Sequence, residues 1–132
     1  MSKSAFSAKV FAIYLFVLGV SLLLAPNFLL TLFGIAPTTE VWIRAVGLLA
    51  FMLGVHMWIA ARHENRPFLE ASVYTRVVVF AVLSTFVFLD LGSPMLALFG
   101  AIDLCGGLWT YFALKADKQM ARPLPASEYF EA

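Results

Sequence analysis

The chain has 132 residues, a mean hydropathy of +0.90 and a formal net charge of +1; 62% of its residues are hydrophobic and 13% are charged. Soluble domains are roughly 45–50% apolar and about 25% charged, and a short water-soluble protein has too little interior to bury so much apolar surface. Composition therefore excludes an ordinary soluble fold, and the small net charge argues against a nucleic-acid partner, which would require a basic stripe.

Four apolar segments predict four membrane-spanning helices in a single membrane domain over residues 1–132. A helix that crosses the hydrocarbon core needs roughly 20 apolar residues, so the chain holds four spans and little else. The predicted spans are 6–25, 41–61, 67–91 and 94–114. The fold class is an all-α integral membrane four-helix bundle. The remainder, 115–132, is expected to be a short flexible tail, in which Pro123-Leu124-Pro125 or Tyr129-Phe130 could dock a partner.

The first connection carries a helix-breaking signal. Pro26 and Asn27 end the first span, because proline cannot donate to the helix ladder. The segment 27–33 is too short to cross a bilayer, so we expect an interfacial half-helix that ends at Gly34. A single bent helix from 6 to 33 is the alternative.

Lysine and arginine are distributed unevenly among the connections. They lie before or in the first turn of the first span, between the second and third, and after the fourth: Lys3, Lys9, Arg62, Arg66, Lys115, Lys118 and Arg122. The connections 34–40 and 90–94 carry neither residue type. By the positive-inside rule this pattern predicts a multi-pass protein of the bacterial inner (cell) membrane with both termini in the cytoplasm.

Ionisable residues inside the spans are the strongest functional pointers, because a charge at the bilayer centre costs roughly 2.5–3.5 kcal/mol by insertion scales. They are Arg44, Arg76, Asp90, Asp103 and the titratable His56. Asp103 shares a helix face with Gly100 and Gly107. Arg44 shares a face with Gly47. Since glycine faces allow helices to approach closely, we predict an Arg44–Asp103 ion pair between the second and fourth spans.

The candidate ligand-binding residues are Arg44, Asp103, Asp90, His56, Trp58 and Asn27. They would form a polar pocket open to the outer face, in which Arg44 binds an anionic or carbonyl-bearing headgroup and Asp103 titrates. The alternative is that these charges neutralise one another and only hold the helices in register. Arg76 is expected to snorkel to lipid phosphate. His56 is expected either to be satisfied within the bundle or to relay protons.

The sequence predicts no catalytic residue and no metal site, and it leaves any cofactor unknown. It has no Gly-rich phosphate loop, no triad spacing and no paired-cysteine motif. The single cysteine, Cys105, lies in the fourth apolar segment and can form no intramolecular disulfide. A non-catalytic protein is therefore expected rather than an enzyme.

Several stretches resemble the DoxX-like family of small four-helix bacterial membrane proteins. They are Leu24-Ala25-Pro26-Asn27, Leu32-Phe33-Gly34-Ile35, the span that contains Gly47 and Gly54, Gly100-Ala101-Ile102-Asp103-Leu104 and Gly106-Gly107-Leu108-Trp109. The resemblance covers about 6–114. It implies a four-helix bundle in the inner membrane and an association with redox assemblies, which in that family include a thiosulfate:quinone oxidoreductase subunit. More distantly, the layout is similar to the sterol-binding bundles related to emopamil-binding protein, whose cavity acids would correspond here to Asp103 and Asp90.

Two functions follow as hypotheses. The first is a protein that binds a quinone-like or lipid-like ligand, or that serves as an accessory subunit of a membrane complex. The second is a proton-coupled small-molecule transporter that works as an oligomer. Small multidrug exporters have a comparable length, but their carboxylate lies in the first span, and 10–25 carries no charge here. The expected partners are membrane lipid, a lipophilic small molecule, and a second copy or another membrane subunit.

Overall fold

The computed structural model describes residues 1–121, which form five α-helices and no strand. The helices are α1 (Lys3–Leu24), α2 (Pro26–Leu32), α3 (Trp42–Arg62), α4 (Arg66–Phe88) and α5 (Met95–Met120). All except α2 are long and apolar enough to cross a membrane. For the described residues, the prediction of an all-helical fold with four helices long and apolar enough to span a membrane is therefore confirmed.

Helix α5 continues beyond the predicted end of the fourth span. It reaches Met120, so the first part of the predicted tail, 115–132, is helical. The tail prediction is wrong there, because the added turns carry Asp117, whose carboxylate binds the start of α1. The proposed docking motifs Pro123-Leu124-Pro125 and Tyr129-Phe130 lie outside the described residues.

The break after the first span separates two helices, as predicted. Ala25 has φ −138°, and α2 starts with Pro26, which has no N–H to donate. At the other end of α2, Gly34 adopts the left-handed conformation with φ 70°. The Ile35 N–H then donates to the Leu30 carbonyl at 2.8 Å, which closes the helix terminus. A single bent helix is excluded.

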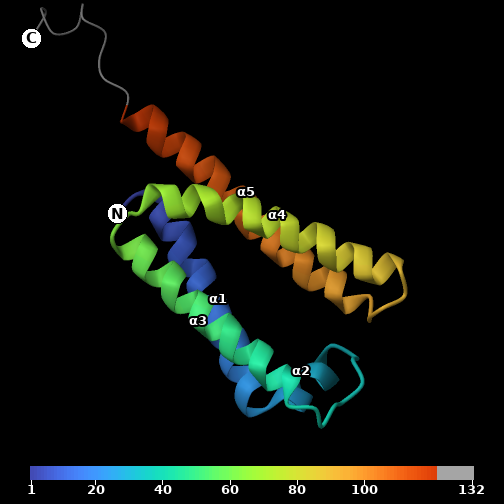
Figure 1. Ribbon diagram of the computed structural model, residues 1–132. Helices are drawn as coiled ribbons and strands as arrows, with labels where there is room; N and C mark the ends of the chain where they lie inside the picture. The colour runs from blue at the N-terminus through green and yellow to red at the C-terminus, as the bar shows by residue number, and fades with distance from the viewer. Residues whose placement is uncertain (122–132) are drawn as a thin grey trace, which may run out of the picture.

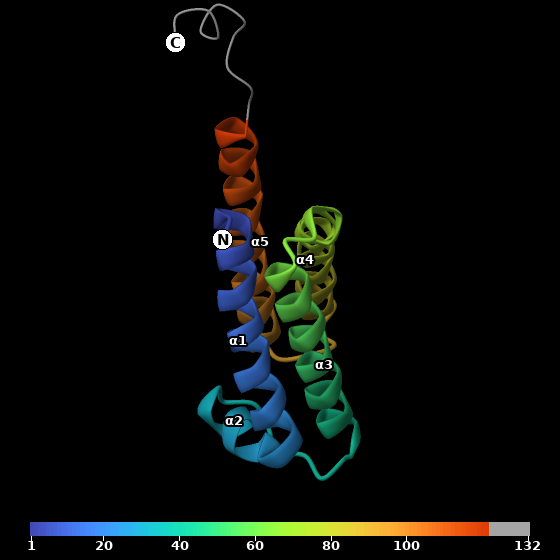
Figure 2. The same cartoon turned by 90° about the vertical axis from the view of Figure 1, so that its left-hand side faces the viewer.

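The four long helices form two antiparallel pairs, α1 with α3 and α4 with α5 (Figure 1). We call the end that holds the N-terminus, the α3–α4 connection and the last turns of α5 the terminal end, and the opposite end the far end. The pairs meet at the terminal end, mainly through α1 and α5, and diverge toward the far end (Figure 1). There α2 lies beyond α1 (Figure 2).

The buried apolar core lies where the two pairs meet. Its members are Ala5, Ala8, Phe11, Ala12, Leu15, Met57, Ala61, Leu69, Val73 and Leu114. Small residues on α1 allow the neighbouring helices to come close, which is how membrane helices associate when lipid already solvates their apolar faces. Toward the far end, one aromatic contact links the pairs: the rings of Phe33 and Phe99 are 5.0 Å apart.

The glycines pack inside each pair rather than between the second and fourth spans. A Cβ atom at Gly47 of α3 would lie 2.8 Å from the Gly19 carbonyl oxygen of α1. Gly100 and Gly107 of α5 instead face Phe80 and Arg76 of α4. The predicted contact between the two glycine faces is therefore wrong, because each face is already filled by the helix's own partner.

Two carboxylates hold the terminal end together. Asp117 accepts hydrogen bonds from the Lys3 N–H and the Ser4 N–H, both at 3.0 Å, and from the Ser4 hydroxyl at 2.6 Å. The Ser2 N–H donates to Glu64 at 2.6 Å. These acceptors satisfy N–H groups that have no partner within α1 and place negative charge at its positive dipole end. They bring three basic segments of the chain to one end of the molecule.

Candidate functional site

Arg44 does not pair with Asp103. Its guanidinium donates through Nη1 to the carbonyl oxygens of Leu23 at 2.5 Å and Leu24 at 3.4 Å, at the end of α1. Among the described residues, only Arg66 and Glu70 bring a side-chain nitrogen and a carboxylate oxygen within 4.0 Å of each other. The predicted Arg44–Asp103 pair is wrong because α3 and α5 belong to different helix pairs, which diverge toward the far end, where Arg44 lies.

Among residues 1–121, Arg76 is the charged residue that is buried. Its side chain, on α4, is only 3% exposed, so the expected snorkelling to lipid phosphate is wrong. The guanidinium lies 3.8 Å from the centre of the Phe11 ring on α1. Its Nη1 donates to the Thr110 hydroxyl on α5 at 3.2 Å, and its Nη2 approaches the Met57 sulfur on α3 at 3.6 Å. Every long helix therefore contributes to the surroundings of this one side chain.

Two consecutive glycines on α5 make room for Arg76. A Cβ atom at Gly106 would lie 3.3 Å from Nη1 of Arg76, and one at Gly107 would lie 3.2 Å from its Cβ. A side chain at either position would force Arg76, and at Gly106 also the Phe11 ring, to shift by a few tenths of an ångström. The Gly106-Gly107 pair is thus the sequence signal that a cation packs here, although its partner on α4 cannot be read from local pattern.

A short chain of hydroxyl groups continues from the arginine to α1. The Thr110 and Ser7 hydroxyl oxygens are 3.0 Å apart, and Ser7 also donates to the Ser4 carbonyl at 2.8 Å. Arg76 Nε, in contrast, has no hydrogen-bond partner among the described residues. A buried donor without an acceptor costs roughly 1–3 kcal/mol, so the site has capacity for one more acceptor.

Asp103 and Tyr14 border the arginine on the side toward the far end. Asp103 is half-buried on α5, seven residues before Thr110 and hence on the same helix face. Its charge interacts with Arg76 and with Tyr14 of α1, although no Arg76 nitrogen lies within 4.0 Å of the carboxylate. Arg76 is ten residues from the start of α4, or roughly 15 Å along it, which is about half the thickness of a bilayer's hydrocarbon core. We call Tyr14, Arg76, Asp103 and Thr110 the arginine site.

Two of the predicted site residues shape connections at the far end. Asn27 is exposed, and its side-chain oxygen accepts the Thr38 N–H at 2.8 Å, which holds the loop after α2. Asp90 is exposed in the α4–α5 connection with φ 58°, a left-handed conformation that aspartate tolerates. The α4–α5 connection lies apart from the start of α3, so the outer pocket predicted around Arg44 does not form (Figure 1).

The other two, His56 and Trp58, lie on α3 outside the arginine site. His56 is on the outer surface with Nδ1 2.7 Å from the Met52 carbonyl, so it is satisfied by its own helix and not inside the bundle. Trp58 is half-buried against the core, 6.3 Å from the Phe16 ring, with the Lys9 ammonium 5.2 Å above it. These contacts explain the position of Trp58 by packing against the core.

Sequence reasoning singled out two members of the arginine site, but it assigned Asp103 the wrong partner and expected Arg76 to snorkel; it did not single out Tyr14 or Thr110 as site residues. Residues 1–121 contain no group of three His, Cys, Asp or Glu side chains that could hold a metal ion. Cys105 is exposed on α5. Comparisons of the chain with protein-family models, with curated proteins and with solved structures find no match.

Proposed function

We propose that this chain is a bacterial inner-membrane protein with both termini in the cytoplasm that binds a lipophilic, quinone-like or lipid-like ligand at the arginine site. One observation carries the proposal: a half-buried carboxylate, Asp103, stands in front of a fully buried guanidinium, Arg76. Ionisable groups at membrane depth are costly and are retained mainly where they bind or move something.

The arrangement of the helices supports a ligand that arrives from the lipid. Beyond the core, the two pairs diverge (Figure 1). The exposed side chains of this part of α1 are apolar and include Val17 and Val20. A lipophilic molecule that entered between the pairs would meet Asp103 and Tyr14, which are both half-buried, at the end of its path. The Tyr14 hydroxyl would donate to a carbonyl oxygen of a quinone-like ligand, and in the reduced form a quinol hydroxyl would donate to the Asp103 carboxylate, while Arg76 stabilises the charge behind them.

The DoxX-like resemblance supports the quinone class of ligand and also the role of accessory subunit in a membrane complex. In that role the ligand would be shared with a partner that performs the chemistry. The chain itself offers Tyr14 and Asp103 for hydrogen bonding and proton exchange, and the proposal assigns it no catalytic step.

Thermal unfolding of the purified protein with decylubiquinol under anaerobic conditions tests the proposal. We expect the quinol to raise the melting temperature of the wild type by several degrees, because a ligand that binds only the folded state stabilises it. Asp103→Asn should lose most of this increase. Asp90→Asn is the matched control, since it makes the same chemical change at an exposed carboxylate outside the site, and it should behave like the wild type. Equal responses of the two variants would refute the assignment.

A proton-coupled transporter is the second candidate, because Asp103 is a carboxylate that both lipid-borne substrates and protons could reach. In proteoliposomes that contain a pH-sensitive dye, a transporter would acidify or alkalise the lumen when a lipophilic cation such as ethidium is added. Asp103→Asn would abolish that movement. A binding protein would show no substrate-driven proton movement in either form.

A further inference from the structure

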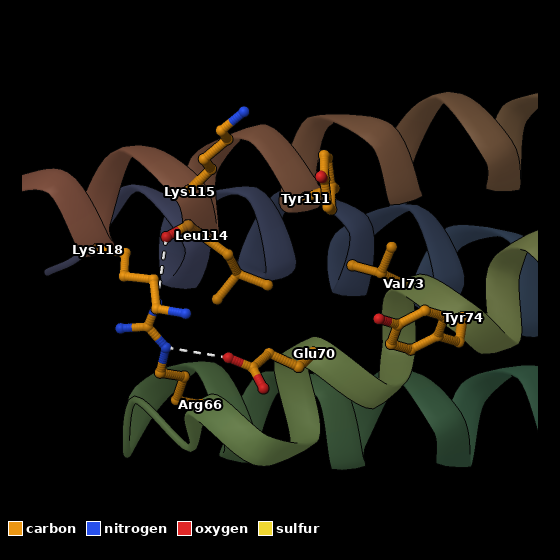
Figure 3. A pocket seen from close by; sticks show the side chains of 8 residues that line it. All are labelled: Arg66, Glu70, Val73, Tyr74, Tyr111, Leu114, Lys115 and Lys118. Carbon is orange, nitrogen blue, oxygen red and sulfur yellow. Dashed lines mark hydrogen bonds and ion pairs between the residues drawn. The ribbon is translucent and has the colours of Figure 1, made fainter.

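A groove opens between α4 and α5 at the terminal end of the molecule. Its volume is about 430 Å³, and its lining residues are Arg66, Glu70, Val73, Tyr74, Tyr111, Leu114, Lys115 and Lys118. Figure 3 shows Arg66 and Glu70 on α4 facing the α5 segment that carries Leu114 and Lys118, with the two tyrosines at the other side of the opening. None of these residues belongs to the arginine site.

The mouth of the groove is positively charged, and hydrogen bonds hold its arginine in place. Its lining has three basic residues, Arg66, Lys115 and Lys118, and one acidic residue, Glu70; the Lys115 side chain extends away from Glu70 (Figure 3). Glu70 accepts from Arg66 Nε at 3.1 Å, and Arg66 Nη2 donates to the Leu114 carbonyl at 3.2 Å. These bonds fix the plane of the guanidinium and use two of its five N–H groups, so the others remain for an anion.

Polarity changes along the groove in the order that an amphiphile requires. Tyr74 lies eight residues after Arg66, or roughly 12 Å farther along α4, and its side chain is 72% exposed. Tyr111 precedes Leu114 on α5, so both rings lie deeper than the charges, at the level where aromatic residues meet the headgroup region. Beyond them, Val77 and Val78 are exposed and apolar.

We propose that this groove binds the phosphate-bearing headgroup of an anionic phospholipid, with its acyl chains along the apolar faces of α4 and α5. Arg66 and Lys118 contact the phosphate, Lys115 adds positive charge at the mouth, and the Tyr74 and Tyr111 hydroxyls reach the ester region. Basic pockets between spanning helices recognise anionic headgroups in this way, with each nearby Lys or Arg contributing roughly 1 kcal/mol. The proposal does not depend on the ligand of the arginine site, and a free phosphate would use only the charged mouth.

The test measures binding of dihexanoyl phosphatidylglycerol to the full chain in a non-ionic detergent, by native mass spectrometry. The charge-removing variant is Lys115→Gln/Lys118→Gln, and the matched control is Lys3→Gln/Arg62→Gln, which removes two exposed charges from the same end outside the groove. We expect the apparent Kd to rise about thirtyfold in the first variant, roughly fivefold for each lysine, and less than threefold in the control. All four side chains are exposed, so neither variant disturbs the core.

Three results would overturn the proposal. Equal weakening in both variants would mean that the terminal end attracts anionic lipid without a site. Equal binding of dihexanoyl phosphatidylcholine would mean that the negative charge of the lipid does not contribute to binding. Competition by millimolar inorganic phosphate, with the same loss in Lys115→Gln/Lys118→Gln, would identify a phosphate site instead of a lipid site.

Discussion

Arg76 is stabilised by an aromatic ring, a hydroxyl group and a sulfur atom, while its nearest opposite charge, Asp103, stands farther away. A guanidinium over an aromatic face gains roughly 2 kcal/mol when both are desolvated, and a hydrogen bond to a charged group gains about 1.5–3 kcal/mol. These contributions are comparable to the cost of inserting an arginine at membrane depth. The residue can therefore remain buried and charged without direct contact to Asp103.

Removing the positive charge of Arg76 should leave the negative charge of Asp103 uncompensated. We expect Arg76→Met to destabilise the fold by about 1–3 kcal/mol, because Asp103 then lacks its compensating charge. The double variant Arg76→Met/Asp103→Leu should return to within about 1 kcal/mol of the wild type, since an apolar pair of similar volume needs no compensation. Unfolding in mixed micelles by titration with dodecyl sulfate measures both. A double variant as unstable as the single one would show that Asp103 and Arg76 are not coupled.

Glu64 provides a pH-dependent contact outside the spans. The hydrogen bond from the Ser2 N–H lowers the pKa of Glu64 below its ordinary value of 4.5. Because the folded-state pKa is the lower one, this bond contributes stability above about pH 4.5 and loses it as the pH falls through the folded-state pKa. We expect the wild type to be more stable than Glu64→Gln at pH 7 and equal to it near pH 3, measured by thermal unfolding. A difference that does not change with pH would contradict this.

Helix α1 is stabilised from outside at both of its ends. Asp117 of α5 binds its first N–H groups, and Arg44 of α3 binds the carbonyl oxygens of Leu23 and Leu24 at its last turn. A carboxylate at the N-terminus and a guanidinium at the C-terminus both match the helix dipole. The arginine that we expected in a ligand pocket therefore has a structural role at this position, which explains its presence at the far end.

Close packing of α1 on α3 gives a prediction at the scale of the helix. A Cβ atom at Gly47 would lie 2.7 Å from the Leu23 backbone nitrogen, whereas one at Gly54 would lie 3.0 Å from the Phe16 ring, which can rotate away. We expect Gly47→Ala to destabilise the protein by about 1–3 kcal/mol and Gly54→Ala by less than half of that. Unfolding titrations of the two variants side by side provide the check, and a reversed order would contradict the packing.

For the whole molecule, the distribution of charge and the fold agree. The segments that carry Lys3, Arg62, Arg66, Lys115 and Lys118 come together at the terminal end through the bonds of Glu64 and Asp117. The connection between α4 and α5, with no lysine or arginine, lies toward the far end. By the positive-inside rule, this polarity supports the proposed orientation, in which the terminal end faces the cytoplasm.

Cysteine labelling tests the proposed orientation. On a Cys105→Ser background, Leu91→Cys places a thiol in the α4–α5 connection and His63→Cys places one in the α3–α4 connection; both positions are exposed. In cells with a permeabilised outer membrane, a membrane-impermeant maleimide should label the first and not the second. Lysis of the inner membrane should make both react. The opposite pattern in unlysed cells would place the termini outside.

The sequence by itself determined the all-helical class, the four helices long and apolar enough to span a membrane and the break at Pro26, because hydropathy and proline act within one segment of chain. Only the tertiary structure decided which helices pair, and with this that Arg76 turns inward to lie near Asp103 while Arg44 binds the end of α1. The physical reason is the solvent. In lipid, the inner and outer faces of a helix are equally apolar, so the sequence pattern does not show which face packs and against which partner.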